Sequence, residues 1–79
     1  MVYPNLSAEI TRAGLTVPKF ADAVGFSVNT LYPKLKGIRE FKLSEMEDIK
    51  NYFSKVAEEK GMQIDTSLEY LFKRDYSAK

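Results

Sequence analysis

The sequence predicts an all-α domain, a compact bundle of about five helices. Over most of the chain, apolar residues recur three or four positions apart, which is the spacing of one helical face. Four of these segments are followed by a glycine, a common helix end, and none shows the alternation typical of a strand. With 79 residues, 44% of them hydrophobic, residues 1–79 are predicted to form a single domain around one core.

The first two helices are predicted between clear start and stop signals. The segment Pro4-Asn5 opens the first helix, and Gly14 ends it. Thr16 is a good N-cap for the second helix, which ends at Gly25. The residues predicted to face the core from these helices are Leu6, Ile10, Ala13, Phe20, Ala21 and Val24.

The third helix is predicted to follow almost at once. It runs from Val28 to Lys36, with Ser27 as its N-cap and Gly37 as its stop. Because only one or two residues separate it from the second helix, the two helices must cross at a steep angle. Leu31 and Leu35 are its predicted core residues.

The second half of the chain predicts a long helix and a short one. The long helix begins at Leu43 and ends near Gly61, and the short helix spans 68–72. In the loop before the long helix, Ile38 and Phe41 are predicted to point inward. The predicted inward residues of the long helix are Leu43, Met46, Ile49, Phe53 and Val56.

Composition excludes several functional classes. The chain has no His and no Cys, so it lacks the common general base, the usual zinc ligands and any disulfide. We therefore expect no enzymatic activity, no metal and no cofactor. The apolar runs are too short to span a membrane, and the N-terminus has no signal-peptide features, so a cytoplasmic protein is expected.

Charge is distributed unevenly, although the net charge is only +1. Residues 11–42 hold six basic and two acidic residues, whereas residues 43–79 hold six basic and eight acidic ones. The basic part coincides with the two closely spaced helices and the loop that follows. The acidic pairs Glu47-Asp48 and Glu58-Glu59 are interpreted as solvated, because adjacent helical residues do not face each other.

Residues 16–37 carry the functional signal. A small residue at Ala21, a glycine at Gly25 and an aliphatic residue at Leu31 allow two helices to touch, turn and stay anchored. This spacing is that of a helix-turn-helix. Over residues 3–72 the chain resembles the small repressor and Cro-type regulators of temperate phages, which have the lambda-repressor-like fold. The matching pieces are Tyr3-Pro4-Asn5-Leu6, Lys34-Leu35-Lys36-Gly37, Glu40-Phe41-Lys42-Leu43-Ser44-Glu45 and Leu68-Glu69-Tyr70-Leu71-Phe72.

The resemblance implies a transcriptional regulator that binds double-stranded DNA. In that family the third helix enters the major groove, usually as a homodimer on a palindromic operator. The family's base-reading positions fall on Val28 and Asn29, with Tyr32 and Pro33 one turn later. Residues expected near phosphates, from the resemblance or from their clustering around the helix pair, are Ser27, Lys19, Lys34, Lys36, Arg39 and Lys42.

Several of these positions admit a second interpretation. Asn29 is suited to adenine but also to satisfying the backbone at a helix start, and the lysines suit solvated surface as well as phosphates. Two residues depart from the family's pattern. Val17 stands where the family often has Gln, and Pro33, inside the third helix, removes a helical hydrogen bond to the carbonyl of Asn29. Tyr32 suits DNA, a partner subunit or simple cover of apolar surface.

A second hypothesis is a protein-binding module of the same fold, such as an antirepressor-like partner of another regulator. Val28, Tyr32 and Pro33 would then form an apolar contact surface. For a homodimer, the last two helices offer Tyr52, Tyr70 and Phe72 as candidate interface residues.

Overall fold

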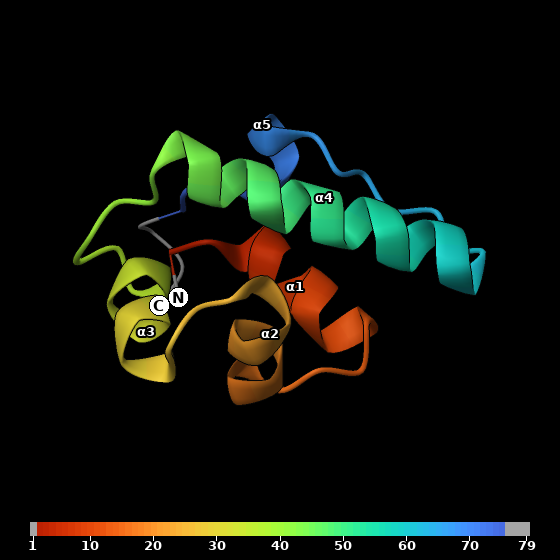
Figure 1. The fold of residues 1–79 in the computed structure, drawn as a ribbon. Helices are drawn as coiled ribbons and strands as arrows, with labels where there is room; N and C mark the ends of the chain where they lie inside the picture. Colours follow the sequence, from red (N-terminus) through yellow and green to blue (C-terminus); the bar gives the residue numbers. More distant parts are fainter. Residues whose placement is uncertain (1, 76–79) are drawn as a thin grey trace.

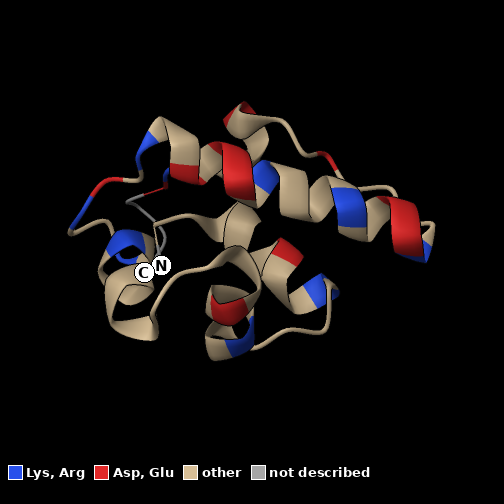
Figure 2. Ribbon diagram, viewed as in Figure 1, with Lys and Arg blue, Asp and Glu red and all other residues tan. Residues whose placement is uncertain are grey.

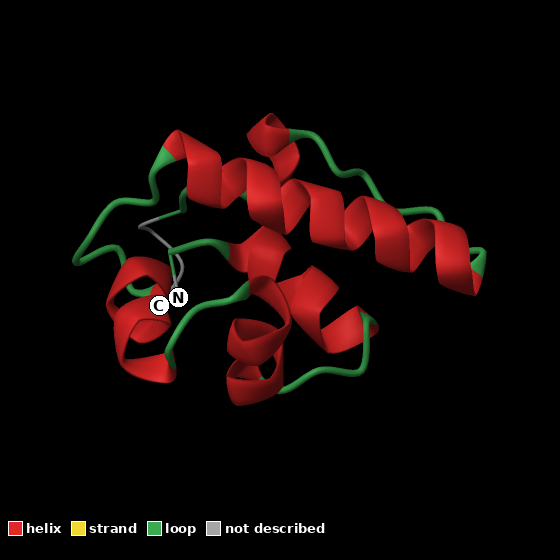
Figure 3. Cartoon of the chain, viewed as in Figure 1, coloured by secondary structure: helices red, strands yellow, loops and turns green. Residues whose placement is uncertain are grey.

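A computed structural model describes residues 2–75 of the chain, which form five α-helices and no strand (Figures 1 and 3). The helices are α1 (Pro4–Arg12), α2 (Val17–Val24), α3 (Val28–Leu35), α4 (Leu43–Lys60) and α5 (Leu68–Leu71). This arrangement confirms the predicted all-α bundle. The predicted ends of the third and fifth helices each lie one residue too far, which is the usual uncertainty of a frayed last turn.

The long helix α4 runs across the molecule. In the view of Figure 1, α1, α2 and α3 lie below α4, and α5 lies above it. It packs against α2 and α5, while α1 packs against α5 and α2 packs against α3. None of the helices within residues 2–75 is long and apolar enough to span a membrane.

The core contains residues from all five helices, together with Tyr3 before α1, Ala13 after it and Phe41 from the loop between α3 and α4. Each large apolar side chain buried there stabilises the fold by about 1.5–3 kcal/mol relative to exposure. The buried apolar residues are Tyr3, Leu6, Ile10, Ala13, Phe20, Ala21, Leu31, Leu35, Phe41, Ile49, Phe53, Val56 and Leu71. Most of the predicted core is thereby confirmed, whereas Val24 and Met46 are only half-buried.

The turn between α2 and α3 forms as its residues predict. Gly25 has φ of +82°, a left-handed conformation that side chains with a Cβ rarely adopt. In this conformation the N–H of Phe26 donates to the carbonyl of Ala21 at 2.8 Å. The hydroxyl oxygens of Thr16 and Ser27 accept the N–H groups of Lys19 and Thr30, which confirms both residues as N-caps.

The prediction that Ile38 points inward is wrong, because its side chain is 75% exposed. The end of α3 explains the difference. The Ile38 N–H donates to the carbonyl of Pro33 at 2.9 Å, and the Gly37 N–H donates to that of Lys34 at 3.1 Å. This pair of bonds is a Schellman motif, which reverses the chain at Gly37 and directs Ile38 away from the core.

The inward prediction for Leu43 is also wrong, since its side chain is 64% exposed. Leu43 is the first residue of α4. At this end of the bundle the core position is filled by Phe41, whose ring packs edge-on against Tyr3 and Phe72, with centroids 5.5 and 5.1 Å away. Leu43 is therefore left outside the core.

Candidate nucleic-acid interface

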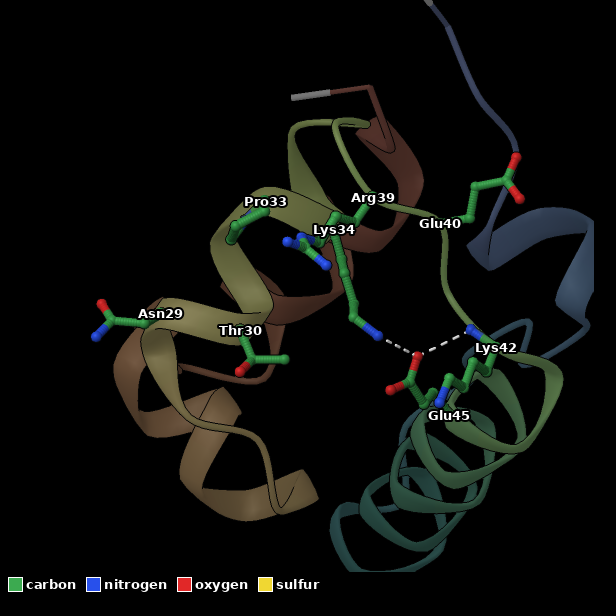
Figure 4. Close-up of a pocket in the computed structure, with 8 residues that line it drawn as sticks. All are labelled: Asn29, Thr30, Pro33, Lys34, Arg39, Glu40, Lys42 and Glu45. Atoms are coloured by element: carbon green, nitrogen blue, oxygen red, sulfur yellow. Dashed lines mark hydrogen bonds and ion pairs between the residues drawn. The ribbon is translucent and has the colours of Figure 1, made fainter.

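Helix α3 has one buried face and one exposed face. Leu31 and Leu35, four residues apart, are fully buried. Asn29, Tyr32 and Lys36 follow a spacing of three and four residues on the opposite face and are exposed. The Asn29 side chain projects away from the body of the protein (Figure 4). This outer face is available to a ligand.

The two apolar residues predicted to touch bases are less accessible. Val28, at the start of α3, is half-buried and packs against the core. Pro33 is half-buried inside α3, and the helix continues through it to Leu35. The Pro33 carbonyl accepts the N–H groups of Ile38 and Arg39 at 2.9 and 3.2 Å. The Pro33 carbonyl therefore takes part in the C-terminal capping of α3, and the Pro33 ring is partly exposed at the surface.

Lys34 differs from the other lysines predicted to contact phosphates, because it is buried and paired within the protein. Its side chain is only 8% exposed, and its ammonium forms an ion pair with Glu45 (Figure 4). The reason is its position in α3, since Lys34 follows Leu31 by three residues and precedes Leu35, so all three share the inward face. Its Nζ lies 5.6 Å from the ring centroid of Phe26.

Glu45 was not singled out by the sequence, and it is the most connected polar side chain of this region. Its Oε1 accepts the backbone N–H of Lys42 at 2.8 Å and a hydrogen bond from the ammonium of Lys34. Burial raises the pKa of the Glu45 carboxyl, but the bonds from Lys34 and Lys42 outweigh it and hold the pKa below its usual value. A signal was present, because Glu45 stands three residues after the residue that precedes α4, the spacing of a capping box.

A hollow of about 860 Å³ lies between α3 and the start of α4. We call it the α3–α4 hollow; it is lined by Asn29, Thr30, Pro33, Lys34, Arg39, Glu40, Lys42 and Glu45 (Figure 4). Both carboxylates on its wall have cationic partners. Glu45 pairs with Lys34, and Glu40 pairs with Arg74 at 3.7 Å.

Arg39 and Lys42 leave the α3–α4 hollow with a positive charge. Both are exposed, and within residues 2–75 neither forms an ion pair. Lys36 is exposed nearby, with its Nζ 5.9 Å from the ring centroid of Tyr32. Figure 2 shows these basic positions gathered at the exit of α3, in the following loop and at the start of α4. Three of the predicted phosphate-binding cations therefore lie beside the outer face of α3.

The remaining predicted phosphate contacts are Lys19 in α2 and Ser27, the N-cap of α3. Lys19 is exposed in the first turn of α2. The Ser27 hydroxyl is already engaged, since it accepts the Thr30 N–H at 3.2 Å and donates to the Thr30 Oγ1 at 2.8 Å. A phosphate that accepts from the Ser27 hydroxyl would therefore replace Thr30 Oγ1 as the acceptor, while the cap on the Thr30 N–H is kept.

The residues suggested for a dimer interface are largely used within the chain. Tyr52 packs edge-on against Phe20, with centroids 6.0 Å apart. The Tyr70 hydroxyl donates to the buried Glu9 at 2.6 Å, and this hydrogen bond raises the pKa of Tyr70. Phe72 packs on the Phe41 ring. The structure leaves all three only half-exposed.

No protein-family model matches the chain, and no curated protein or solved structure matches it.

Proposed function

We propose that the protein is a sequence-specific DNA-binding transcriptional regulator of the phage repressor or Cro type, with α3 as the helix that enters the major groove. The observation that carries this proposal is the outer face of α3, where Asn29, Tyr32 and Lys36 are exposed next to two cations, Arg39 and Lys42, that form no ion pair with the described residues 2–75. The proposal involves no enzymatic activity.

The dimensions and the chemistry of α3 suit a major groove. Its eight residues give a rod of about 12 Å at about 1.5 Å per residue, and a groove about 12 Å wide admits one helix. The Asn29 amide, at the exposed start of α3, has the donor and acceptor that pair with the N7 and N6 of adenine. Tyr32 lies one turn further along the same face.

Phosphate binding would come from the surrounding cations. Lys36 directly follows α3, Arg39 lies in the next loop, Lys42 directly precedes α4, and Lys19 lies in α2. The nearby carboxylates of Glu40 and Glu45 form ion pairs with Arg74 and Lys34. The exposed cations can therefore bind phosphates, although the net charge of the chain is only +1. Each phosphate neutralised contributes about 0.9 to the slope of log affinity against log salt.

We further propose that the protein acts as a homodimer on a palindromic operator, in the cytoplasm. A dimer with two-fold symmetry places two copies of α3 one helical turn of DNA apart, about 34–36 Å. A single α3 reads only a few base pairs, so the second copy supplies the sequence length that specificity requires.

A protein-binding module is the second candidate, because three large apolar side chains are exposed in α3, in the loop after it and at the start of α4. Tyr32 is 37%, Ile38 is 75% and Leu43 is 64% exposed. A partner of this kind would be another regulatory protein.

Selection from a pool of random DNA duplexes separates the two candidates. The purified protein is bound to the pool, retained duplexes are amplified and sequenced, and the cycle is repeated at rising salt. We expect enrichment of one sequence with two inverted half-sites. The triple variant Asn29→Ala, Tyr32→Ala, Lys36→Ala serves as the control and should enrich none. Absence of enrichment by the wild-type protein would reject the DNA proposal and favour the protein-binding module.

A further inference from the structure

Lys34 and Glu45 link two helices that are otherwise separated by the α3–α4 hollow. Lys34 belongs to the last turn of α3 and Glu45 to the first turn of α4. Helix α3 packs on α2, and α4 also packs on α2, whereas the α3–α4 hollow lies between α3 and the start of α4. The ion pair spans this gap (Figure 4).

A single carboxylate oxygen makes the link. Glu45 Oε1 accepts both the Lys34 ammonium and the backbone N–H of Lys42, which precedes α4. The same oxygen of Glu45 thus accepts a backbone N–H at the start of α4 and binds the Lys34 ammonium of α3. A rotation or shift of α3 relative to α4 must therefore be taken up by the Lys34 side chain, which is packed between the two helices, or lengthen its bond to Glu45.

Two aromatic rings restrict the cation further. The Lys34 Nζ lies 5.6 Å from the ring centroid of Phe26 and 5.9 Å from that of Phe41. Phe26 lies just before α3, and Phe41 lies just before α4. A cation near aromatic rings is attracted to their faces, so these two rings favour the same position of Lys34 as Glu45 does.

We propose that the Lys34–Glu45 pair is a positioning element, which sets the orientation of α3 and thereby the ability of the protein to distinguish its preferred DNA from other DNA. The second half of this proposal rests on the proposed function. Lys34 is buried and Glu45 is half-buried, so desolvation offsets part of the attraction between them, and we assign the pair an effect on geometry. Base contacts require placement within about 0.5 Å, whereas phosphate contacts by long lysine side chains tolerate looser placement.

The first test needs no DNA. Amide hydrogen exchange is measured by NMR for the wild-type protein and for Lys34→Met, whose side chain keeps the apolar stem between the rings and loses the charge. We expect the amides of Leu31 and Leu35 in α3 to exchange about tenfold faster, with those of Ile10 in α1 and Ala13 at its end, whose N–H donates to the carbonyl of Glu9, unchanged. Equal changes in both helices, or no change in either, would show that the pair does not position α3.

The second test measures affinity for a selected duplex and for a shuffled duplex of the same composition. Lys34→Met and Glu45→Gln should each lower the ratio of the two affinities about tenfold, and the double variant should lower it no further, because the two residues act as one pair. Two exposed neighbours provide matched controls. Lys36→Met should weaken both duplexes equally, and Glu47→Gln should change neither.

The outcomes separate the two proposals. Equal loss on both duplexes for Lys34→Met would overturn the role of the pair in discrimination, even if the wild-type protein prefers one duplex. If the wild-type protein prefers no duplex, the proposed function fails and the role in discrimination fails with it. The hydrogen-exchange result then still decides whether the pair positions α3.

Discussion

At the scale of single residues, Asn29 is the side chain best placed to recognise a base. It is exposed at the first turn of α3 and points away from the protein (Figure 4). If it pairs with an adenine, Asn29→Ala should cost about 1–3 kcal/mol on the preferred duplex and much less on a shuffled one. Fluorescence anisotropy titrations with both duplexes measure this difference. Equal losses would reduce Asn29 to a structural residue of the helix start.

Pro33 lies inside a helix, although proline has the lowest helix propensity of all residues. It lies inside α3 and cannot donate to the carbonyl of Asn29. Replacing it by serine supplies that N–H, so Pro33→Ser should raise the free energy of unfolding by about 1–2 kcal/mol, less than the full helical penalty because proline also restricts the unfolded chain. Affinity for the preferred duplex should change by less than about tenfold, or 1.4 kcal/mol.

Chemical denaturation followed by circular dichroism measures the effect of Pro33→Ser on stability. The matched control is Pro18→Ser, because Pro18 lies in the first turn of α2, where a backbone N–H has no helical acceptor. That variant should be neutral or slightly less stable. A lower free energy of unfolding for the Pro33→Ser variant would mean that α3 depends on the proline, which contradicts the expected stabilisation.

At the scale of elements, the exit of α3 and the start of α4 form the phosphate-binding region of the proposed complex. Lys36→Ala, Arg39→Ala and Lys42→Ala should each lower the slope of log affinity against log salt by about one unit, on any DNA sequence. Lys55→Ala, an exposed lysine in the second half of α4, is the control and should leave the slope unchanged. Unchanged slopes for all three variants would place the DNA elsewhere on the protein.

The helices and their ends could be predicted because their signals are local. Thr16, Ser27 and Gly25 each act on the backbone within a few residues of themselves, so their neighbours in the sequence determine their roles. Ile38 was misplaced because its direction depends on the hydrogen bonds that close α3 on Pro33. Helical spacing places Lys34 on the side of Leu31, but its ion pair with Glu45, eleven residues away, is a tertiary contact that no pattern of spacing specified.

In the candidate site, too, the features set by local spacing could be predicted and those set by tertiary contacts could not. The exposed face of α3 follows from the burial of Leu31 and Leu35, so Asn29 and Tyr32 could be placed outward from helical spacing alone. The α3–α4 hollow could not be predicted, because it depends on how far the loop holds two helices apart. Which cations remain unpaired depends on tertiary contacts for the same reason.

At the scale of the whole molecule, a buried carboxylate connects the two ends of the chain. Glu9 in α1 is 1% exposed and accepts the Tyr70 hydroxyl of α5 at 2.6 Å and the Arg12 guanidinium at 3.1 Å. The Asn5 side-chain amide adds a bond to the Tyr70 carbonyl at 3.0 Å. These contacts hold the short helix α5 against α1.

Tyr70→Phe should lower the free energy of unfolding by about 1–3 kcal/mol at neutral pH, because Glu9 loses a donor that it cannot replace with water. Its hydrogen bond to Glu9 raises the pKa of Tyr70, so the neutral tyrosine stabilises the fold below its ordinary pKa of about 10, and this stabilisation is lost as the pH rises through the raised value. Urea titrations at neutral and alkaline pH test both statements. Tyr32→Phe, at the exposed face of α3, is the control and should leave stability unchanged.

If α3 reads a DNA sequence, as we propose, the protein must prefer one duplex over another, and a ratio of two affinities measures that preference. The dissociation constants of the wild-type protein are measured for the selected duplex and for a shuffled duplex of the same composition, at one near-physiological salt concentration. A sequence-reading protein should prefer the selected duplex by a factor of about 10³ or more. A ratio within about threefold, together with a salt-dependent affinity for both duplexes, would show that only phosphates are bound and would contradict the claim.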